Sequence, residues 1–413
     1  MFPLNCYIII SMNVYFDNAA STMVRSEAVD TMIRVMTERF GNPSSMHAYG
    51  RQARDELELA RKRIADAINT QAKNVYFTSG GTEANNWAIF GAVDSIKRSG
   101  KNQISGKHII TSAIEHSAVM DPIKNLETKG FEVSYLMPDQ AGRIPAQDFY
   151  DALRDDTIFA SVMLVNNETG SVNPVDEYSK EIKRRGLDTI LHTDAIQGLC
   201  KIPFTVKSLG ADLITVSSHK LHGPKGVGAL FVRDDIKLTP LILGGNHEKG
   251  IRGGTEALPA AVGFGVAAQL GISEFDDISS KVRNLREYIS EKLKAEIPGI
   301  VFIGEGDSQG NSHSPGESHS LFGSHSPFIL CISLPGHQSE VLMSYLDGEG
   351  ICVSRSAACK KGARSRTLEA MKLKNDVIDG SLRVSFSRYS TIEEADYFIT
   401  VLKKASETIF KAL

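Results

Sequence analysis

A lysine at the end of an apolar run is the residue of this sequence best suited to covalent chemistry. The run 213–217 stops at Ser217-Ser218-His219-Lys220, and a Gly-Pro pair then breaks the chain. This pattern is typical of a buried strand that delivers Lys220 to a loop at its carboxyl end. Partial burial lowers the pKa of a lysine and frees its amine to form a Schiff base with a carbonyl compound. A lysine that reaches the surface or pairs with a carboxylate fits this stretch equally well when it is taken alone.

A glycine-rich turn upstream of that lysine has the features of an anion site. Residues 75–78 predict a short strand, and Ser79-Gly80-Gly81-Thr82 leads from it into a helix that runs to about Ile96. The first amides of a helix are unpaired and point outward, so a phosphate is the natural guest there. A plain turn between a strand and a helix explains this motif equally well when it is considered alone.

Three more polar clusters follow predicted strands. A lone His116 or Asp194 is more often part of a turn whose polar groups are hydrogen-bonded than of a site. Together with the cluster that ends at Lys220, however, these make four clusters at the same end of one sheet, which indicates a binding site. The three are Ala113-Ile114-Glu115-His116, Asn166-Asn167-Glu168-Thr169-Gly170 and His192-Thr193-Asp194-Ala195-Ile196-Gln197.

Alternating strands and helices bring these clusters to one edge. The alternation implies right-handed βαβ units in a mainly parallel sheet with helices on both faces. The loops at the carboxyl ends of the strands then build the site. We expect strands over 75–78, 108–112, 131–136, 158–165, 189–192 and 213–217, and helices over 26–39, 52–68, 117–129 and 176–185.

The pattern predicts an α/β protein with a large domain and a smaller α+β domain. A long polar helix over 272–297 leads into the smaller domain, where strands over 329–334, 351–354 and 382–386 accompany helices over 339–349 and 392–413. Residues 304–327 are rich in Ser, Gly and His and indicate a surface loop, whose irregularly spaced His313, His319 and His325 do not favour a metal site. We assign 1–26 to an N-terminal segment that joins the small domain, 27–266 to the large domain and 267–413 to the small one.

The composition is that of an ordinary globular protein. The chain has 413 residues, a formal net charge of −3 and five cysteines. Interspersed charges give no electrostatic footprint for nucleic acid. An odd number of scattered cysteines without metal-ligand spacing is typical of free thiols in the cytoplasm. The apolar run Ile8-Ile9-Ile10 is too short to cross a membrane and lacks the flanks of a signal peptide, so we expect Met12 to be the natural start.

The polar groups together fit pyridoxal phosphate. This cofactor needs a lysine for its Schiff base, a helix start for its phosphate and a carboxylate that keeps its pyridinium nitrogen protonated. Asp194 suits the last role. His116 can stack on the ring and move protons.

In its motifs the chain resembles the cysteine desulfurases of the NifS/IscS type, in the class V aminotransferase family of fold-type I pyridoxal phosphate enzymes. The resemblance runs from about Val14 to the C-terminal helix and rests on many motifs in the same order. These are Tyr-Phe-Asp-Asn-Ala-Ala (15–20), Phe-Gly-Asn-Pro-Ser-Ser (40–45), Thr-Ser-Gly-Gly-Thr-Glu-Ala-Asn-Asn (78–86), Glu-His (115–116), Val-Asn-Asn-Glu (165–168), Thr-Asp-Ala-Ile-Gln (193–197), Ser-Ser-His-Lys (217–220), Gly-Pro-Lys-Gly (223–226), Arg-Gly-Gly-Thr (252–255) and Ala-Ala-Cys (357–359).

The resemblance implies a role for each matching residue. Lys220 would form the Schiff base, Asp194 would pair with the pyridinium nitrogen, and His116 would stack on the ring as an acid–base group. Cys359 would take the sulfur. The remaining residues would be Gln197 and Asn167 at the phenolic oxygen, Gly81, Thr82, Ser217 and His219 at the phosphate, Thr255 at the phosphate of the other subunit of a homodimer, and Asn42 with Arg383 at the substrate carboxylate.

The implied reaction removes sulfur from L-cysteine and releases L-alanine. Lys220 would take the Cα proton, and the Cys359 thiolate would attack the substrate sulfur and keep it as a persulfide. The sulfur would pass to an iron–sulfur cluster scaffold or a tRNA-thiolation enzyme. Selenocysteine lyase and another class V activity, such as a transaminase, are alternatives, although a transaminase needs no thiol. A sulfur-trafficking scaffold with a decayed site is disfavoured because the costly polar groups are intact.

Three features depart from the family pattern. Members usually carry Ser-Gly-Ser-Ala-Cys, whereas Ser354-Arg355-Ser356-Ala357-Ala358-Cys359 introduces an arginine and loses the glycine, and the segment that follows is shorter. Gly253 replaces the usual serine. The insert near 304–327 has no counterpart. We expect these changes to affect the reach of the cysteine loop and the choice of acceptor more than the chemistry.

Overall fold

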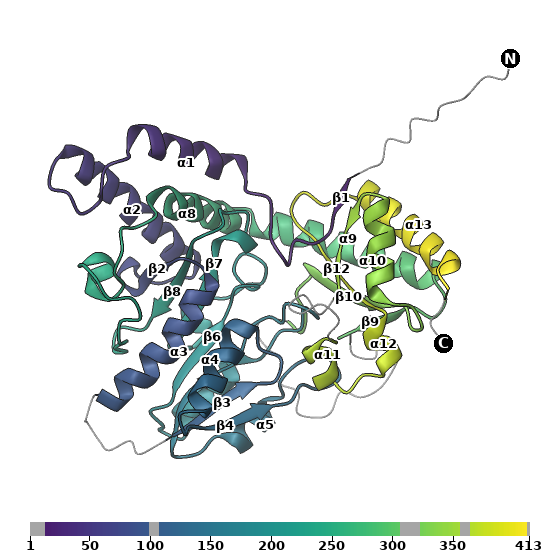
Figure 1. Ribbon diagram of the computed structural model, residues 1–413, viewed down its shortest axis with the longest axis horizontal. Coiled ribbons are helices and arrows are strands. Elements are labelled where there is room, and N and C mark those ends of the chain that lie inside the picture. The colour runs from purple at the N-terminus through teal and green to yellow at the C-terminus, as the bar shows by residue number, and fades with distance from the viewer. Residues whose placement is uncertain (1–12, 99–106, 306–322, 356–363, 411–413) are drawn as a thin grey trace.

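The protein folds into two bodies, each built around one sheet (Figure 1). The computed structural model describes residues 13–98, 107–305, 323–355 and 364–410. A seven-stranded sheet forms the large body, and its mainly parallel strands confirm the predicted α/β class. In spatial order its strands are β2 (Val75–Thr78), β8 (Gly228–Val232), β7 (Leu213–Ser217), β6 (Ile190–Asp194), β5 (Thr157–Ser161), β3 (His108–Ser112) and β4 (Glu132–Leu136).

The strand β8 has no counterpart in the sequence analysis. It lies between β2 and β7 and runs antiparallel to both. The chain returns beside β7 directly after the loop of Lys220, since antiparallel neighbours need only a short connection. The first residue of the strand is Gly228, and a larger residue would not fit there, because a Cβ atom would lie 2.7 Å from the carbonyl carbon of Gly80. The strand therefore brings the glycine-rich turn close to the end of β7.

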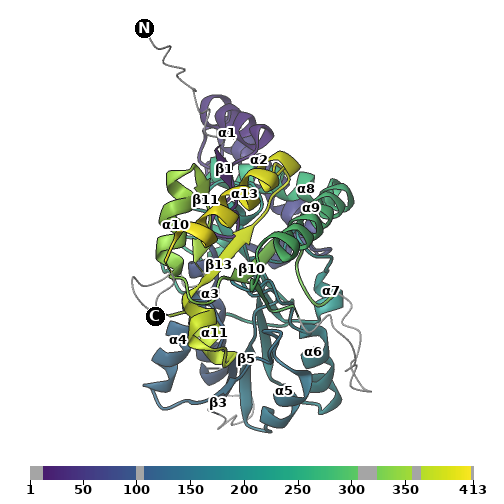
Figure 2. The ribbon, with the colours of Figure 1, turned by 90° about the vertical axis from the view of Figure 1, so that its right-hand side faces the viewer.

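Helices cover both faces of the large sheet because successive side chains of a strand point to opposite sides. Leu213 of β7 packs with α3 (Gly81–Arg98) and α4 (Ser117–Glu127), whereas Ile214 belongs to the core on the other face. Figure 2 shows α4 and α6 on opposite sides of β5. The second face packs against α2 (Ala48–Ala67), α5 (Ala146–Ala152), α6 (Val175–Arg184), α7 (Val206–Leu209) and α8 (Leu258–Ser273), and α1 (Ser26–Glu38) packs on α8.

The smaller body is an antiparallel sheet with helices on both faces. Leu382 and Val384 of β13 (Ser381–Ser385) pack against α9 (Phe275–Glu296), α10 (Ser339–Gly348) and α13 (Ile392–Thr408). Arg383 between them therefore points the other way. The strand β13 lies between β12 (Ser354–Arg355) and β10 (Ile329–Ser333), and β9 (Val301–Ile303) pairs with β10 at the edge. The helices α11 (Arg366–Ala370) and α12 (Asn375–Asp379) cover the other face.

Two connections join the bodies. At the N-terminal end, β1 (Val14–Tyr15) pairs with β11 (Ile351–Cys352) of the smaller body before the chain crosses to α1. At the other crossing, α8 continues past residue 266, and the chain bends by 73° into α9. The segment boundaries at 26 and 266 stay a prediction. Among the described residues no single helix is long and apolar enough to span a bilayer, and α8 with α9 is so only as this bent pair.

A buried ion pair anchors the loop between β8 and α8. Glu248 lies in this loop with a left-handed φ of 46°. Arg61 of α2 donates to its two carboxylate oxygens at 2.6 and 2.8 Å, and the amide of Phe77 donates to it at 2.9 Å. The side chains of Arg61 and Glu248 are only 5% and 1% exposed. The loop is thereby tied to the edge strand β2.

We predict that Glu248→Ala destabilises the fold by about 3–5 kcal/mol, because it leaves a buried guanidinium without its charge partner. The measurement is the free energy of unfolding in urea. Glu58→Ala is the matched control, since Glu58 contacts the same Arg61 at 3.2 Å but is 55% exposed. It should cost at most about 1 kcal/mol. Equal losses in the two variants would contradict the prediction.

Candidate active site

A cavity of about 730 Å³ lies at the carboxyl edge of the large sheet, facing the smaller body. The ends of β5, β6 and β7 and the starts of α3 and α4 form one wall, and Arg383 with α11 forms the opposite wall. Most of the residues predicted from the sequence line it. These are Gly81, Thr82, His116, Asn167, Asp194, Gln197, Ser217, His219, Lys220 and Arg383.

Lys220 lies in a short 3₁₀ turn (Ser218–Lys220) directly after β7. Its Nζ donates to the carbonyl oxygens of Ala19 and Ala20 at 2.7 and 2.6 Å. Burial lowers the pKa of Lys220 to about 8, and the positive charge of Arg383 contributes in the same direction. The amine is therefore much closer to its neutral, nucleophilic form than an exposed lysine.

Asp194 ends β6, next to β7 in the sheet. Its Oδ1 accepts a hydrogen bond of 3.0 Å from the amide of Ile196, and its Oδ2 accepts one of 2.7 Å from Asn85 Nδ2 in α3. Burial raises the pKa of Asp194, and both hydrogen bonds oppose that rise. A cation placed against this carboxyl group would favour its ionised form.

His116 begins α4 as its N-cap, where Nδ1 accepts a hydrogen bond of 3.1 Å from the amide of Ala118. That bond leaves Nε2 as the nitrogen that carries the proton in the neutral ring. The imidazole is exposed to the cavity. It can therefore lie against a planar ligand and exchange a proton through Nε2.

The glycine-rich turn is shaped by close packing. A Cβ atom on Gly81 would lie 2.2 Å from Cδ1 of Ile196 and 3.6 Å from Cβ of Ser217, so a side chain there would displace the end of Ile196. The start of α3 thus presents free amides beside Thr82 and Ser217. Burial and nearby lysines lower the pKa of His219 to about 4, so its ring is neutral near pH 7.

Arg383 connects the two bodies within the cavity. Its guanidinium donates to the carbonyl oxygen of Asn167 at 2.9 Å and to Asp17 Oδ1 at 2.9 Å. The arginine is 2% exposed, and its Nε lacks a protein partner among the described residues. It can offer a carboxylate a fork of donors if Asp17 gives way.

Two predicted site residues lie outside the cavity of their own chain. Asn42 is exposed in the loop between α1 and α2, where its Oδ1 accepts from the amide of Ser44 at 2.8 Å. Thr255 is exposed just before α8. A third, Cys359, lies outside the described residues, as do Met12, His313 and His319. Within the described part of the chain no group of His, Cys, Asp and Glu has the arrangement of a metal site.

A cross-body contact around Glu168 escaped the sequence analysis. Ser365 and Thr367, at the start of α11, donate to its carboxyl group at 2.5 and 2.9 Å, and Arg366 donates to the carbonyl oxygen of Glu115. Burial raises the pKa of Glu168. The chain is thus attached to the large sheet where it emerges from residues 356–363. The Val-Asn-Asn-Glu motif contained Glu168, but no local pattern connects it with a serine 197 positions later.

Glu115 is a second buried carboxyl group of the cavity wall. Ser112 Oγ and the amide of Met163 donate to its Oε1 at 2.5 and 2.9 Å, whereas Oε2 has no protein partner among the described residues. Burial raises the pKa of Glu115 to about 8, and the neighbouring Asp194 adds to the rise. The side chain is therefore mostly a neutral acid at pH 7.

Comparison with known proteins agrees with this geometry. The chain matches the class V aminotransferase family over residues 14–398. It is 38% identical over 398 residues to cysteine desulfurase IscS of Dictyoglomus turgidum, covering 96% of this chain and 95% of that protein. IscS of Methanosarcina thermophila is 38% identical over 391 residues, covering 94% and 91%. A solved NifS-like protein superposes with a TM-score of 0.85 at 32% identity, covering 96% of this chain and 100% of that one.

The chain belongs to the class V aminotransferase family, whose members in general use pyridoxal phosphate. A solved relative, SspA in complex with cysteine, superposes with a TM-score of 0.74 at 31% identity and covers 92% of this chain and all of that one. Within the family, the chain is of the NifS/IscS cysteine desulfurase type, as the near full-length identities show.

We predict that Glu115 makes the fold less stable as the pH rises. Its pKa is about 8 in the folded protein and 4.5 in the reference state, so the unfolded chain releases this proton first. The contribution of Glu115 to the free energy of unfolding is fully present below about pH 4.5 and declines up to about pH 8. Glu115→Gln should remove a decline on the order of a few kcal/mol, measured as urea unfolding free energies at pH 5 to 8. Glu369→Gln, an exposed residue of the same cavity, should leave it intact; a decline of unchanged size in Glu115→Gln would contradict the prediction.

Proposed function

We propose that this protein is a pyridoxal phosphate-dependent cysteine desulfurase, which converts L-cysteine to L-alanine and takes up the sulfur on Cys359. The observation that carries the proposal is the Lys220 amine, whose pKa burial lowers to about 8, in one cavity with Asp194, His116 and the glycine-rich turn. The near full-length identity to IscS proteins of two organisms supports the choice of substrate.

The residues of the cavity fit the cofactor in shape and in chemistry. The glycine-rich turn offers unpaired amides at a point where a side chain on Gly81 would press on Ile196. The phosphate would lie there with Thr82, Ser217 and His219, while Asp194 would face the ring nitrogen. Gln197 and Asn167 would orient the phenolic oxygen, and Lys220 would hold the cofactor covalently. When bound, the cofactor supplies an electron sink for charge that develops at the substrate Cα.

The chain's own residues provide the proton transfers and the orientation. Lys220 Nζ, whose pKa burial lowers to about 8, lies at the cavity against two backbone carbonyls and would be the base that takes the proton from the substrate Cα. Arg383 would bind the substrate carboxylate in exchange for Asp17. His116 Nε2 can give a proton to, or take one from, the substrate thiol.

Sulfur transfer requires a thiol that reaches this cavity. The Cys359 thiolate would form an S–S bond with the substrate sulfur while the Cβ–S bond breaks and its electron pair remains with the carbon fragment. Protonation of that fragment completes alanine. The chain is held on both sides of the segment 356–363 that contains Cys359. Arg355 pairs with Glu340 at 2.6 Å before it, and Ser365 donates a hydrogen bond to Glu168 after it.

Selenocysteine lyase is the second candidate, because the same cavity would accept the selenium analogue of cysteine. The two activities differ in their need for Cys359, since a lyase releases its product without a protein thiol. The sulfur acceptor, an iron–sulfur scaffold or a tRNA-thiolation enzyme, and a cytoplasmic location also remain part of the proposal.

Purified protein should be yellow and should release alanine and sulfide in equal amounts from cysteine and a reductant. Cys359→Ala should keep the colour and lose at least about 99% of sulfide release, because the thiol is the nucleophile. Lys220→Ala should lose both the colour of the lysine-bound cofactor and turnover. Cys352→Ala is the matched control, since Cys352 is an exposed free thiol. Normal desulfuration by Cys359→Ala would refute the assignment of the thiol, and protein that never takes up the cofactor would refute the proposal as a whole.

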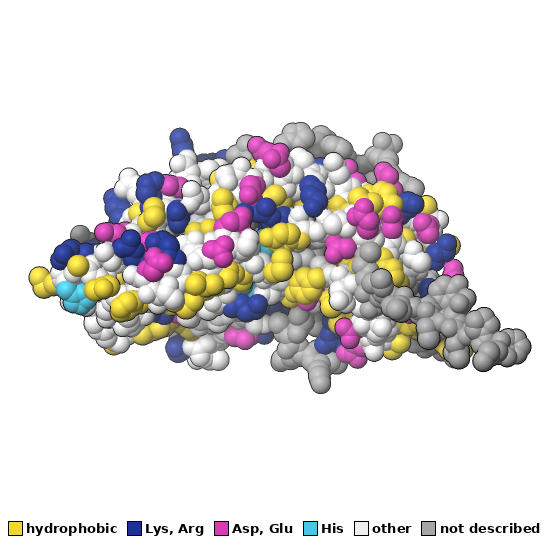
Figure 3. All heavy atoms as spheres, turned by 90° about the horizontal axis from the view of Figure 1, so that it is seen from above, with side chains coloured by type: hydrophobic (Ala, Val, Ile, Leu, Met, Phe, Trp, Pro, Cys, Tyr) yellow, Lys and Arg dark blue, Asp and Glu magenta, His cyan; other side chains and the backbone are white. Residues whose placement is uncertain are grey.

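We further propose that the protein acts as a homodimer with shared sites. The surface over α1, α2 and their loop carries many exposed apolar side chains, and Figure 3 shows such side chains gathered among arginines and lysines on this part of the molecule. Asn42 and Thr255 lie outside the cavity of their own chain, so a second copy could supply them. Arg252 fixes the loop of Thr255 by donating to Glu83 at 2.8 and 2.9 Å. The exposed apolar residues are Met23, Val29, Ile33, Met36, Phe40, Met46, Tyr49 and Leu59.

Hybrid dimers test the sharing of sites. Lys220→Ala has no working lysine, and Thr255→Val should weaken cofactor binding about tenfold through the loss of one phosphate hydrogen bond. If Thr255 serves the other subunit, a hybrid of the two chains contains one wild-type site and binds the cofactor there with wild-type affinity. Light scattering should give twice the chain mass. A hybrid whose only lysine-bearing site shows the weak affinity would contradict sharing.

A further inference from the structure

A second lysine, Lys201, is more deeply buried than Lys220 and is linked to it through Gln197. Lys201, four residues after Gln197, is 6% exposed. Its Nζ donates a hydrogen bond of 2.7 Å to Gln197 Oε1, and Gln197 Nε2 donates one of 2.8 Å to the carbonyl oxygen of Ala19. That same carbonyl accepts from Lys220 Nζ. The two amines are therefore linked through one amide side chain and one backbone carbonyl.

The position of Lys201 requires an explanation, because a buried amine is costly to solvate. Burial lowers the pKa of Lys201 to about 7, and the positive charges of Lys220 and Arg383 contribute to that fall. No carboxylate is hydrogen-bonded to its amine among the described residues. The Gln197 oxygen is its one side-chain partner there. The amine thus serves Gln197 rather than an ion pair.

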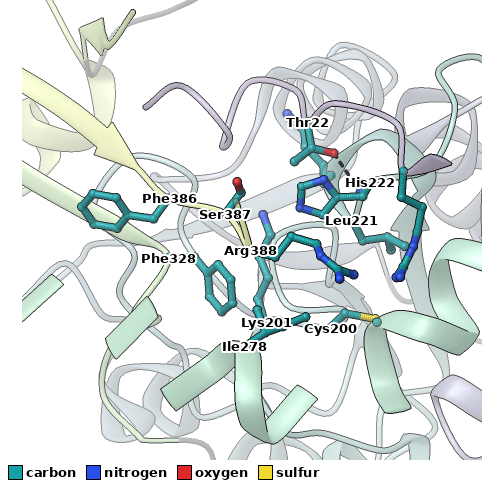
Figure 4. Close-up of a pocket in the computed structure, with 13 residues that line it drawn as sticks. Thr22, Cys200, Lys201, Leu221, His222, Ile278, Phe328, Phe386, Ser387 and Arg388 are labelled. Carbon is teal, nitrogen blue, oxygen red and sulfur yellow. Dashed lines mark hydrogen bonds between the residues drawn. The ribbon is translucent and has the colours of Figure 1, made fainter. Parts of the chain in front are cut away.

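A small cavity lies beside Lys201, and Lys220 lines it as well. This cavity has room for one or two water molecules, at about 30 Å³. Figure 4 shows Lys201 next to Cys200, with Phe328, Ser387 and Arg388 reaching in from the smaller body. Lys201 does not line the large cavity, whereas Gln197 does. Lys220 lines both cavities, so an effect of Lys201 on a ligand in the large cavity can pass through Gln197, through Lys220 and the shared Ala19 carbonyl, or through charge.

Two partners set which way the amide of Gln197 points, and Lys201 is one of them. An ammonium group carries three donors and no acceptor. When Lys201 is protonated, as it is below its pKa of about 7, Gln197 must present Oε1, because Nε2 would place donors against donors. Nε2 is then directed to the opposite side, where one of its two protons goes to Ala19 and the second remains for a group in the large cavity. Lys201 and the Ala19 carbonyl favour the same orientation of the amide, so without Lys201 that orientation loses one of its two hydrogen bonds.

We propose that Lys201 is a positioning residue, which holds the Gln197 amide so that an N–H group, not the carbonyl oxygen, faces the phenolic oxygen of the cofactor. The proposal deepens the proposed function and rests on it. An oxyanion accepts hydrogen bonds, so the held orientation stabilises it, whereas the flipped amide would oppose two oxygens. Stabilising that oxygen makes the lysine-bound cofactor easier to deprotonate.

The test is the pH titration of the visible absorption of the cofactor bound to Lys220, without substrate. Lys201→Met removes the amine at nearly constant volume and should raise the midpoint by on the order of one pH unit. It should also weaken cofactor binding several-fold in equilibrium dialysis. Lys201→Arg, which keeps a donor-only group, should stay nearer to wild type. Lys207→Met, an exposed lysine nearby in the sequence, is the matched control and should change neither value.

Coupling to Gln197 separates positioning from a plain effect of charge. In a Gln197→Met background, Lys201→Met should shift the midpoint by less than half of its shift in the wild-type chain. Shifts of equal size in both backgrounds would overturn the proposal, since Lys201 would then act by its charge. An unchanged midpoint in Lys201→Met that still binds the cofactor would also overturn it and leave the proposed function standing. Circular dichroism and thermal unfolding verify that each variant is folded.

The groups that share the surroundings of Lys201, and whose charges enter the titration, are Lys220, Arg383, Cys200, Arg25, Arg388 and His222.

Discussion

The burial of the Lys220 amine is the constraint on which the rest of the site depends. An amine removed from water must find acceptors, and here the carbonyls of Ala19 and Ala20 provide them at 2.7 and 2.6 Å. These carbonyls belong to a segment that starts in a strand pair of the smaller body and ends in α1 of the large one. The lysine can thus be desolvated only when both bodies are in place.

The same reasoning explains why charged groups cross between the bodies. Arg383 from the smaller sheet is satisfied by the Asn167 carbonyl at the end of a large-body segment and by Asp17 from the N-terminal segment. Glu168 receives the hydroxyl groups of Ser365 and Thr367. At the bend between α8 and α9, Glu274 accepts from Arg25 and Arg388. Each pair would be costly to separate, so the polar contacts that form the cavity also set the relative placement of the bodies.

Much of the fold could be predicted because hydrophobic period and turn residues are local. The strands 108–112 and 213–217 were expected at the residues where they occur, and α1, α3 and α6 were expected within a few residues. The misses have two causes, short length for α5 and long-range pairing for the strands. β8 is an apolar run whose partner choice depends on a packed neighbour, and α5 is only seven residues long. The predicted strand 351–354 divides at Val353, because β11 pairs with β1 while β12 pairs with β13. Pairing is a long-range property that no local pattern contains.

The sequence by itself determined which chemical groups are available and that most of them share one edge of a sheet. Lys220, Asp194, His116 and the glycine-rich turn follow from strand ends and motifs, because parallel strands bring their carboxyl ends together. Only the tertiary structure decided what surrounds these groups. The pKa of Lys220 near 8, the neutral Glu115 and the amide of Gln197 held by Lys201 all depend on burial and on contacts between distant residues. The tertiary structure also showed that Asn42 and Thr255 lie outside their own cavity. Desolvation and packing arise only when the chain is folded, so a linear pattern can name the reacting groups but cannot set their charge, orientation or neighbours.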